Sequence, residues 1–144
     1  VFNFYRPGYV PPGTAAATAN LMVPEMQIVH ETTAAGYVNV MRDNVSAGVG
    51  AFGATNNRRD LQGNFAAEIA LADRPAELVA AVNRKLMYGS MPAALATEIE
   101  GAVTSIAIPA ATGSNQAQID TAKRNRVNAA IFLALVSPEF LVQK

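Results

Sequence analysis

The sequence predicts an all-α protein, an irregular bundle of helices (about five) preceded by an extended segment rich in proline, glycine and aromatic residues. Three observations predict this class. Apolar residues recur every three or four positions along much of the chain, which is the spacing of a helix face packed on a core. Proline and glycine gather between these stretches, where helices start and stop. No two runs alternate apolar and polar residues convincingly, so no strand pair is expected.

The composition is that of one ordinary domain with little charge. The chain has 144 residues, of which 51% are hydrophobic and 15% are charged. Soluble domains carry about 25% charged residues, so we expect protein to cover part of this surface. Eleven basic and eleven acidic residues balance, which argues against a nucleic-acid partner or an anionic membrane surface. The absence of cysteine excludes disulfides, thiolate nucleophiles and cysteine-type zinc sites within the chain.

Residues 1–13 predict an extended leader, because three prolines and two glycines interrupt any regular helix. The leader also holds four aromatic rings, those of Phe2, Phe4, Tyr5 and Tyr9. Aromatic rings favour burial, and an extended segment cannot bury them on itself. We therefore expect the four rings to dock on the helices that follow or on another part of the protein, which makes them candidate interaction residues.

Residues 14–47 predict two helices joined by a connector. Thr14 can cap a short alanine-rich helix that runs to about Met22 and ends before Pro24. The second helix starts at Thr32 or Thr33 and continues to the end of this range, with Gly48 after it. Apolar residues at every fourth position define its buried face, and these are Tyr37, Met41 and Val45.

Residues 48–64, rich in glycine and asparagine, predict a long loop with weak structure. Within this range, Gly48, Gly50 and Gly53 match the spacing of a dinucleotide-binding fingerprint, and Asp73 follows the last glycine by 20 positions. That fingerprint works only between a preceding strand and a following helix, whose N-terminus meets the pyrophosphate. Here a predicted helix precedes and a polar loop follows, so we expect no bound cofactor.

Residues 65–144 predict the helical core. The last long helix, from Ser114 to about Val136, is apolar on nearly all sides in its second half. We therefore expect it to lie at the centre of the core. The expected segments are a connector with a helical turn over 65–73, a helix from Pro75 to about Met87, a helix capped by Ser90 and broken at Pro109, a helix from Ser114 to about Val136, and a helical turn that begins at Ser137.

Four polar residues are the nearest candidates for chemistry: His30, Asp43, Arg58 and Arg59. His30 is the only histidine, and the second histidine of a helical zinc motif is absent, because residue 34 is alanine. No nucleophile and base stand at a productive spacing, so the sequence predicts no catalytic set and no metal site within this chain.

Two further features have ordinary explanations. Ser137 resembles a nucleophile only if a base lies near it; none is evident in the sequence, and a helix cap explains this residue. Lys123, Arg124 and Arg126 form a small basic face, which we interpret as solvated charge with local pairing, including a pair between Asp120 and Arg124.

Several stretches carry a family resemblance that spans essentially the whole chain. They are residues 1–13 (Val-Phe-Asn-Phe-Tyr-Arg-Pro-Gly-Tyr-Val-Pro-Pro-Gly), 23–28 with 31–32, the helix over 78–86, and 126–143 with its Leu-Val-Ser-Pro-Glu-Phe-Leu-Val-Gln ending. Together they resemble the C-terminal region of a bacterial family known as domain of unknown function 1800. Members of that family are several hundred residues long and often exported. The resemblance therefore implies a periplasmic or extracellular protein, and it brings no established catalytic residues.

The chain opens on valine rather than methionine, with aromatic residues that nothing shelters. We interpret residues 1–144 as a single helical unit, the C-terminal fragment of a longer protein. Its first expected role is a structural or interaction module that packs against its own N-terminal portion or a protein partner. The alternatives are part of an enzyme, such as a hydrolase, with an active site mainly in the absent portion, or a subunit of a surface assembly. No apolar run approaches the roughly 20 residues that a transmembrane helix needs.

Overall fold

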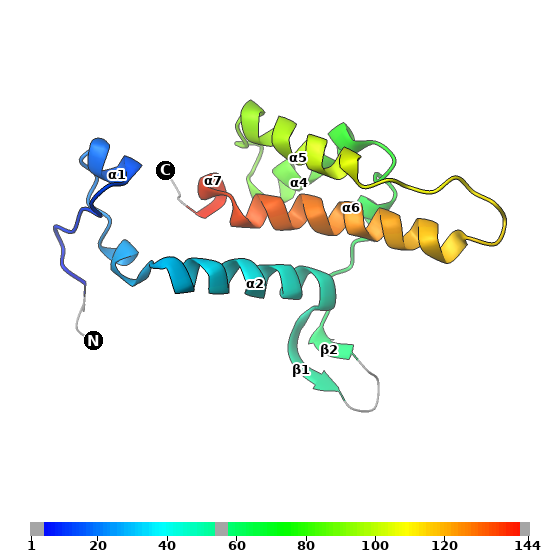
Figure 1. Cartoon of the computed structure of the whole chain (residues 1–144), viewed down its shortest axis with the longest axis horizontal. Coiled ribbons are helices and arrows are strands. Elements are labelled where there is room, and N and C mark those ends of the chain that lie inside the picture. The colour runs from blue at the N-terminus through cyan, green and yellow to red at the C-terminus, as the bar shows by residue number, and fades with distance from the viewer. Residues whose placement is uncertain (1–4, 54–57, 142–144) are drawn as a thin grey trace. The chain divides into compact units, whose positions relative to one another are not determined.

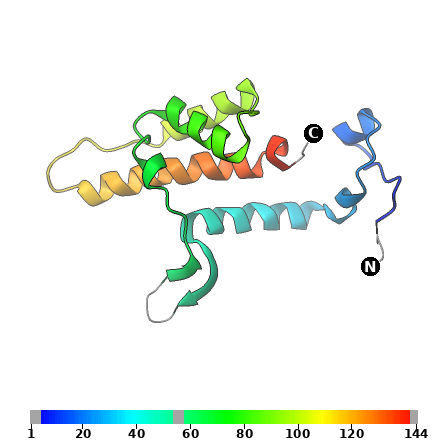
Figure 2. The same ribbon diagram turned by 180° about the vertical axis from the view of Figure 1, so that it is seen from behind.

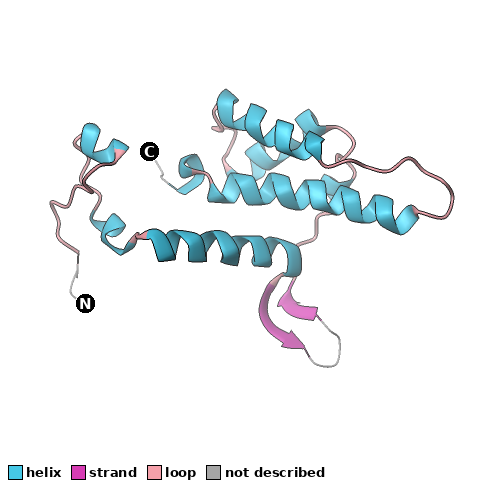
Figure 3. Cartoon of the chain, in the orientation of Figure 1, coloured by secondary structure: helices cyan, strands magenta, loops and turns pink. Residues whose placement is uncertain are grey.

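The structure, a computed structural model, describes residues 5–53 and 58–141 and is mostly helical (Figure 1, Figure 3). This confirms the predicted class, although the described residues form seven α-helices, one 3₁₀ helix and a two-stranded sheet. The chain divides into two compact units, Val1–Asn39 and Val40–Lys144, and each is described here by itself. Phe2 and Phe4 lie outside the described residues.

The first unit starts with the leader and two short helices. Helix α1 (Ala15–Thr18) begins as predicted, because the Thr14 hydroxyl accepts a hydrogen bond from the Ala17 N–H at 3.2 Å. The helix ends well before the predicted Met22, since Asn20 adopts a positive φ of 51° that a helix cannot contain. The segment predicted as a connector contains the 3₁₀ helix η1 (Pro24–Ile28), with proline in its first turn.

The leader docks on the chain that follows it. The Tyr9 carbonyl accepts a hydrogen bond from the Val23 N–H at 2.9 Å. The Gln27 side-chain amide donates to the Pro24 carbonyl at 2.9 Å and lies 3.4 Å from the Arg6 carbonyl. The main chain of the leader is thus held against η1, and the side chain of Tyr9 is half-buried.

Helix α2 (Glu31–Ala47) starts in the first unit and ends in the second. Its first turn is fixed by the Thr33 hydroxyl, which accepts from the His30 N–H at 2.9 Å. Gly48 ends it with a φ of +92°, as the sequence predicts. The predicted stripe of Tyr37, Met41 and Val45 is the less exposed side of the helix, but none of these residues is buried.

Residues 48–64 contain an antiparallel hairpin, so the prediction of a loop without strands is wrong. Strand β1 (Val49–Gly53) pairs with β2 (Arg58–Leu61), with a break in register along β1. A Cβ atom at Gly48 would lie 2.2 Å from the Leu61 carbonyl oxygen, and one at Gly50 would lie 2.6 Å from the Asp60 carboxylate. The strands approach this closely only because glycine occupies both positions.

The second unit contains the helical core (Figure 2). Its helices are α3 (Ala66–Ile69), α4 (Pro75–Leu86), α5 (Ala93–Ser105), α6 (Gln116–Val136) and α7 (Pro138–Leu141). Helix α6 packs against the other four, and α4 also packs against α5. The largest fully buried side chains share this centre, and they are Leu78, Val82, Ile99, Val103 and Val127.

Several helices begin or end at other residues than predicted, and the serines expected to cap them do not do so. The Ser90 hydroxyl donates to the Met87 carbonyl and does not cap α5, which begins two residues after Met91. Helix α5 also ends four residues before Pro109. Helix α6 follows Asn115, whose carboxamide accepts from the Thr112 N–H at 2.9 Å. The amide side chain, rather than Ser114, orders this turn.

The basic face of α6 is not simply solvated. The Arg126 guanidinium donates to the Ile106 carbonyl at 2.8 Å and to the Ala72 carbonyl at 2.9 Å, groups that lie 20 and 54 residues away in the sequence. Lys123 pairs with Asp73. The interpretation of these two residues as solvated and locally paired is therefore wrong, because both tie α6 to distant parts of the chain.

We expect Gly48→Ala to open the hairpin, because the added methyl group would lie 2.2 Å from the Leu61 carbonyl oxygen at a φ that side chains rarely adopt. Cross-strand NMR contacts between Val49 and Leu61 should disappear. The matched control is Gly101→Ala on α5, where a Cβ meets nothing within 4 Å. The control should raise the free energy of unfolding by about 0.5–1 kcal/mol and leave the hairpin unchanged. An intact hairpin in Gly48→Ala would contradict this account.

We expect Arg126→Lys to lower the free energy of unfolding by about 1 kcal/mol, because a single ammonium group cannot reach both carbonyls in the geometry of a guanidinium fork. Urea denaturation would measure the change. Arg124→Lys is the control, since Arg124 is exposed on the same helix and should change stability very little. Equal effects of the two substitutions would show that the Arg126 contacts contribute nothing.

Candidate functional site

His30 and Asp43, two of the four polar candidates, have local partners. His30 is exposed where α2 starts, and its Nδ1 lies 2.7 Å from the Thr32 hydroxyl oxygen. Asp43 pairs with Arg42 at 3.0 Å on the surface of α2, and both side chains are more than half exposed. These contacts are typical of a helix start and of a helix surface.

The two arginine candidates are neighbours on β2, where Arg58 is the first residue of the strand. The Arg59 guanidinium donates to the Gly50 carbonyl at 2.8 Å, so this side chain links the two strands of the hairpin. His30 belongs to the first unit, and Asp43, Arg58 and Arg59 belong to the second. The structure therefore describes no site that contains all four candidates.

Ser137 is a structural residue. Its side chain is almost fully buried, and the hydroxyl donates to the Ala134 carbonyl at 2.8 Å. The same oxygen accepts from the Phe140 N–H at 3.3 Å, which starts α7 (Pro138–Leu141). Both bonds belong to the turn between two helices, which is the capping role that the sequence suggests.

Glu68, which the sequence gives no reason to single out, is the one buried carboxylate of the described residues. It accepts a hydrogen bond from the Lys85 ammonium group. This bond is the main reason why the pKa of Glu68 lies below its ordinary value. Burial acts in the opposite direction and is the weaker effect. A carboxylate that is held ionised in this way suits an ion pair better than proton transfer. The described residues hold no group of three or more histidine, cysteine, aspartate or glutamate side chains that could bind a metal.

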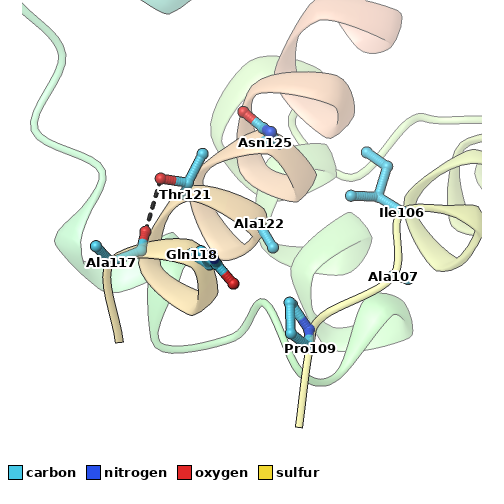
Figure 4. A pocket seen from close by; sticks show the side chains of 8 residues that line it. All are labelled: Ile106, Ala107, Pro109, Ala117, Gln118, Thr121, Ala122 and Asn125. Atoms are coloured by element: carbon cyan, nitrogen blue, oxygen red, sulfur yellow. Dashed lines mark hydrogen bonds between the residues drawn. The ribbon is translucent and has the colours of Figure 1, made fainter. Parts of the chain in front are cut away.

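An open hollow of about 390 Å³ lies between α6 and the chain that leaves α5 (Figure 4). Ile106, Pro109 and Ala122 supply apolar surface, and Gln118 and Asn125 place carboxamides there. Arg126 positions one wall, because it holds the Ile106 carbonyl. The remaining lining residues are Ala107, Ala117 and Thr121.

The hollow is suited to bind an uncharged ligand. None of its lining residues is ionisable, so it offers no general acid, base or charged nucleophile. The Thr121 hydroxyl donates to the Ala117 carbonyl at 2.7 Å along the helix (Figure 4). Two carboxamides on an apolar surface can hydrogen-bond a neutral partner, but they cannot carry out catalysis by themselves.

The first unit differs from the second in having no buried residue among those described, 5–39. It nevertheless holds large apolar side chains, five of which are at least 40% exposed: Leu21, Met22, Ile28, Val29 and Val38. Only three of its described residues are charged, namely Arg6, Glu25 and Glu31. The interaction candidates Tyr5 and Tyr9 are half-buried.

No protein-family model, curated protein or solved structure matches the chain. The resemblance of its ends to a bacterial family therefore stays a prediction. Over the described residues, no helix is both long and apolar enough to cross a membrane.

Proposed function

We propose that this chain is a structural or interaction module, in which the helical core is a scaffold and the first unit packs against further protein. The packing partner is another portion of the same polypeptide or a separate protein. One observation carries the proposal: the first unit exposes large apolar side chains and buries none of its described residues. Exposed apolar surface of this kind typically marks a place where protein binds.

The charge distribution supports the same role. With only three charged side chains among its described residues, the first unit has little that favours contact with water. Each square ångström of apolar surface removed from water contributes about 25 cal/mol, so covering several of these side chains would stabilise a complex. The resemblance of the two chain ends supports a further proposal, that the protein is exported to the periplasm or the cell exterior.

The helical core supports a scaffold role rather than catalysis. Its buried carboxylate is paired with Lys85, its buried hydroxyl on Ser137 closes a turn, and its open hollow is lined by neutral groups. Each of these polar features is explained by folding or by binding. We therefore propose no reaction for this part of the chain.

Hydrogen exchange on the purified chain tests the proposal. Amides of α4 and α6 should be protected, whereas those of the first unit should exchange at least about 100-fold faster, because local stability follows buried apolar contacts. A fluorescent probe of apolar surface should bind the chain. Its binding should fall when Leu21, Met22 and Val29 are together replaced by aspartate.

Tyr88→Asp is the matched control, because Tyr88 is 95% exposed but belongs to the second unit. Its replacement should leave probe binding unchanged. The proposal would be wrong if the first unit were as well protected as α6 in a monomeric chain. It would also be wrong if the triple substitution and the control had the same effect.

A further inference from the structure

We propose that residues 66–74 form an acid-sensitive latch, which detaches from α4 and α6 before the rest of the helical core unfolds. The latch comprises α3 and the turn that leads into α4. Three side chains from α4 and α6 reach it from positions that are distant in the sequence. This inference concerns the core and is independent of the function proposed above for the first unit.

The first contact is the pair of Glu68 with Lys85 of α4. The Glu68 side chain is 5% exposed, whereas the Lys85 side chain is 62% exposed. The carboxylate is thus the buried partner, and the amine reaches it from the surface. When the pair is broken, Lys85 returns easily to water, but Glu68 loses its charged partner.

The second and third contacts come from α6. Lys123 pairs with Asp73 across 50 residues of sequence, and the Arg126 guanidinium donates to the Ala72 carbonyl at 2.9 Å. Lys123 and Arg126 are three positions apart and therefore lie on the same side of α6. Two cations of one helix face hold the second half of the latch.

The latch has little else to hold it. Helix α3 has only four residues, which is far too short for an isolated helix to be stable. Ala72 is the only fully buried apolar residue of the latch, and the larger Ile69 and Leu71 are partly buried. The neighbouring α4 instead buries Leu78 and Val82 almost completely. Charged contacts therefore contribute a larger share of the stabilising interactions in the latch than in the rest of the core.

The charges around the latch make it sensitive to acid. The side chains of α4 and α6 that pair with its carboxylates, Lys85 and Lys123, are cationic, and Arg126 binds its main chain. Glu77 of α4 pairs with Arg74, the last residue of the latch, but both of these side chains are more than half exposed. Asp120 accepts from Gln116. The remaining charged residues of α4 and α6, Arg84 and Arg124, are exposed. Protonation of Glu68 would leave the Lys85 ammonium group without its anionic partner.

The direction of the pH effect follows from Glu68. The hydrogen bond from Lys85 is the largest cause that holds the pKa of Glu68 below its ordinary value of 4.5. A carboxyl group whose pKa is lowered by folding stabilises the folded state. This stabilisation is fully present only above the ordinary pKa of the group. That stability is lost as the pH falls through the pKa in the folded state. The latch should therefore be closed at neutral pH, begin to lose this stabilisation only below 4.5 and open in acid.

Opening has a structural consequence within the second unit. Residues 62–65 connect the latch directly to β2 of the hairpin. A detached latch would lengthen the tether between the hairpin and α4 by the whole of residues 66–74. The latch thereby sets how far the hairpin can move from the helical core.

An NMR titration of the full chain from pH 7 to pH 3 tests the latch. Amide signals of Ile69, Leu71 and Ala72 should move to random-coil positions at a higher pH than signals of Val82 and Val127. Loss of all these signals in one step would overturn the proposal.

Two variants and a control sharpen the test. Glu68→Gln should show random-coil latch signals already at pH 7. Lys85→Met removes only the cation and should raise the pH of opening. The control is Glu100→Gln on α5, which is exposed and should titrate like the native chain. If Glu68→Gln does not fold, the Lys85→Met chain decides: an unchanged pH of opening would overturn the proposal.

Discussion

The packing of α6 is the constraint on which the rest of the structure depends. Val127, Ala130 and Ala134 are completely buried along one side of this helix, and α3, α4, α5 and α7 all contact it. Two of the three are alanines, so neighbouring helices can approach α6 closely on this side. Because interiors are packed as densely as organic crystals, a side chain added here would displace several helices together. The other helices have little contact with one another beyond that between α4 and α5, so α6 is their common partner.

Apolar burial and charged contacts have different places in the second unit. Large side chains such as Leu78 and Ile99 are buried at the centre, where each contributes about 1.5–3 kcal/mol. Charged contacts gather instead where the hairpin joins the core, at Glu68, Asp73 and Arg126. Exposed ion pairs contribute about 0–1 kcal/mol, so they cannot replace an apolar core. They can orient a short segment, and unlike apolar burial they depend on pH.

The helices were predictable because their signals are local. Residues 75–86 and 116–136 repeat apolar residues at helical spacing, and Gly48 and Gly89 mark ends with positive φ. The hairpin has no such signal: β1 carries glycines that permit close approach, and β2 is mostly charged, so neither alternates apolar and polar residues. The partners of Arg126 are main-chain carbonyls far away in the sequence, which leave no trace in the pattern of side chains. The hollow beside α6 likewise depends on where an irregular connection runs.

The shortage of charge in the composition can be located in the structure. A chain with only 15% charged residues has much apolar surface to place, but composition alone cannot say where it lies. The second unit buries its apolar stripes, which meet on α6. The first unit does not: its apolar residues lie in the leader, in two short helices and on the start of α2, and none of its described residues is buried. Such apolar residues gain stability when another surface removes them from water. The two units thus differ in kind: the second buries a hydrophobic core, whereas the described residues of the first bury none, and we propose that further protein covers it.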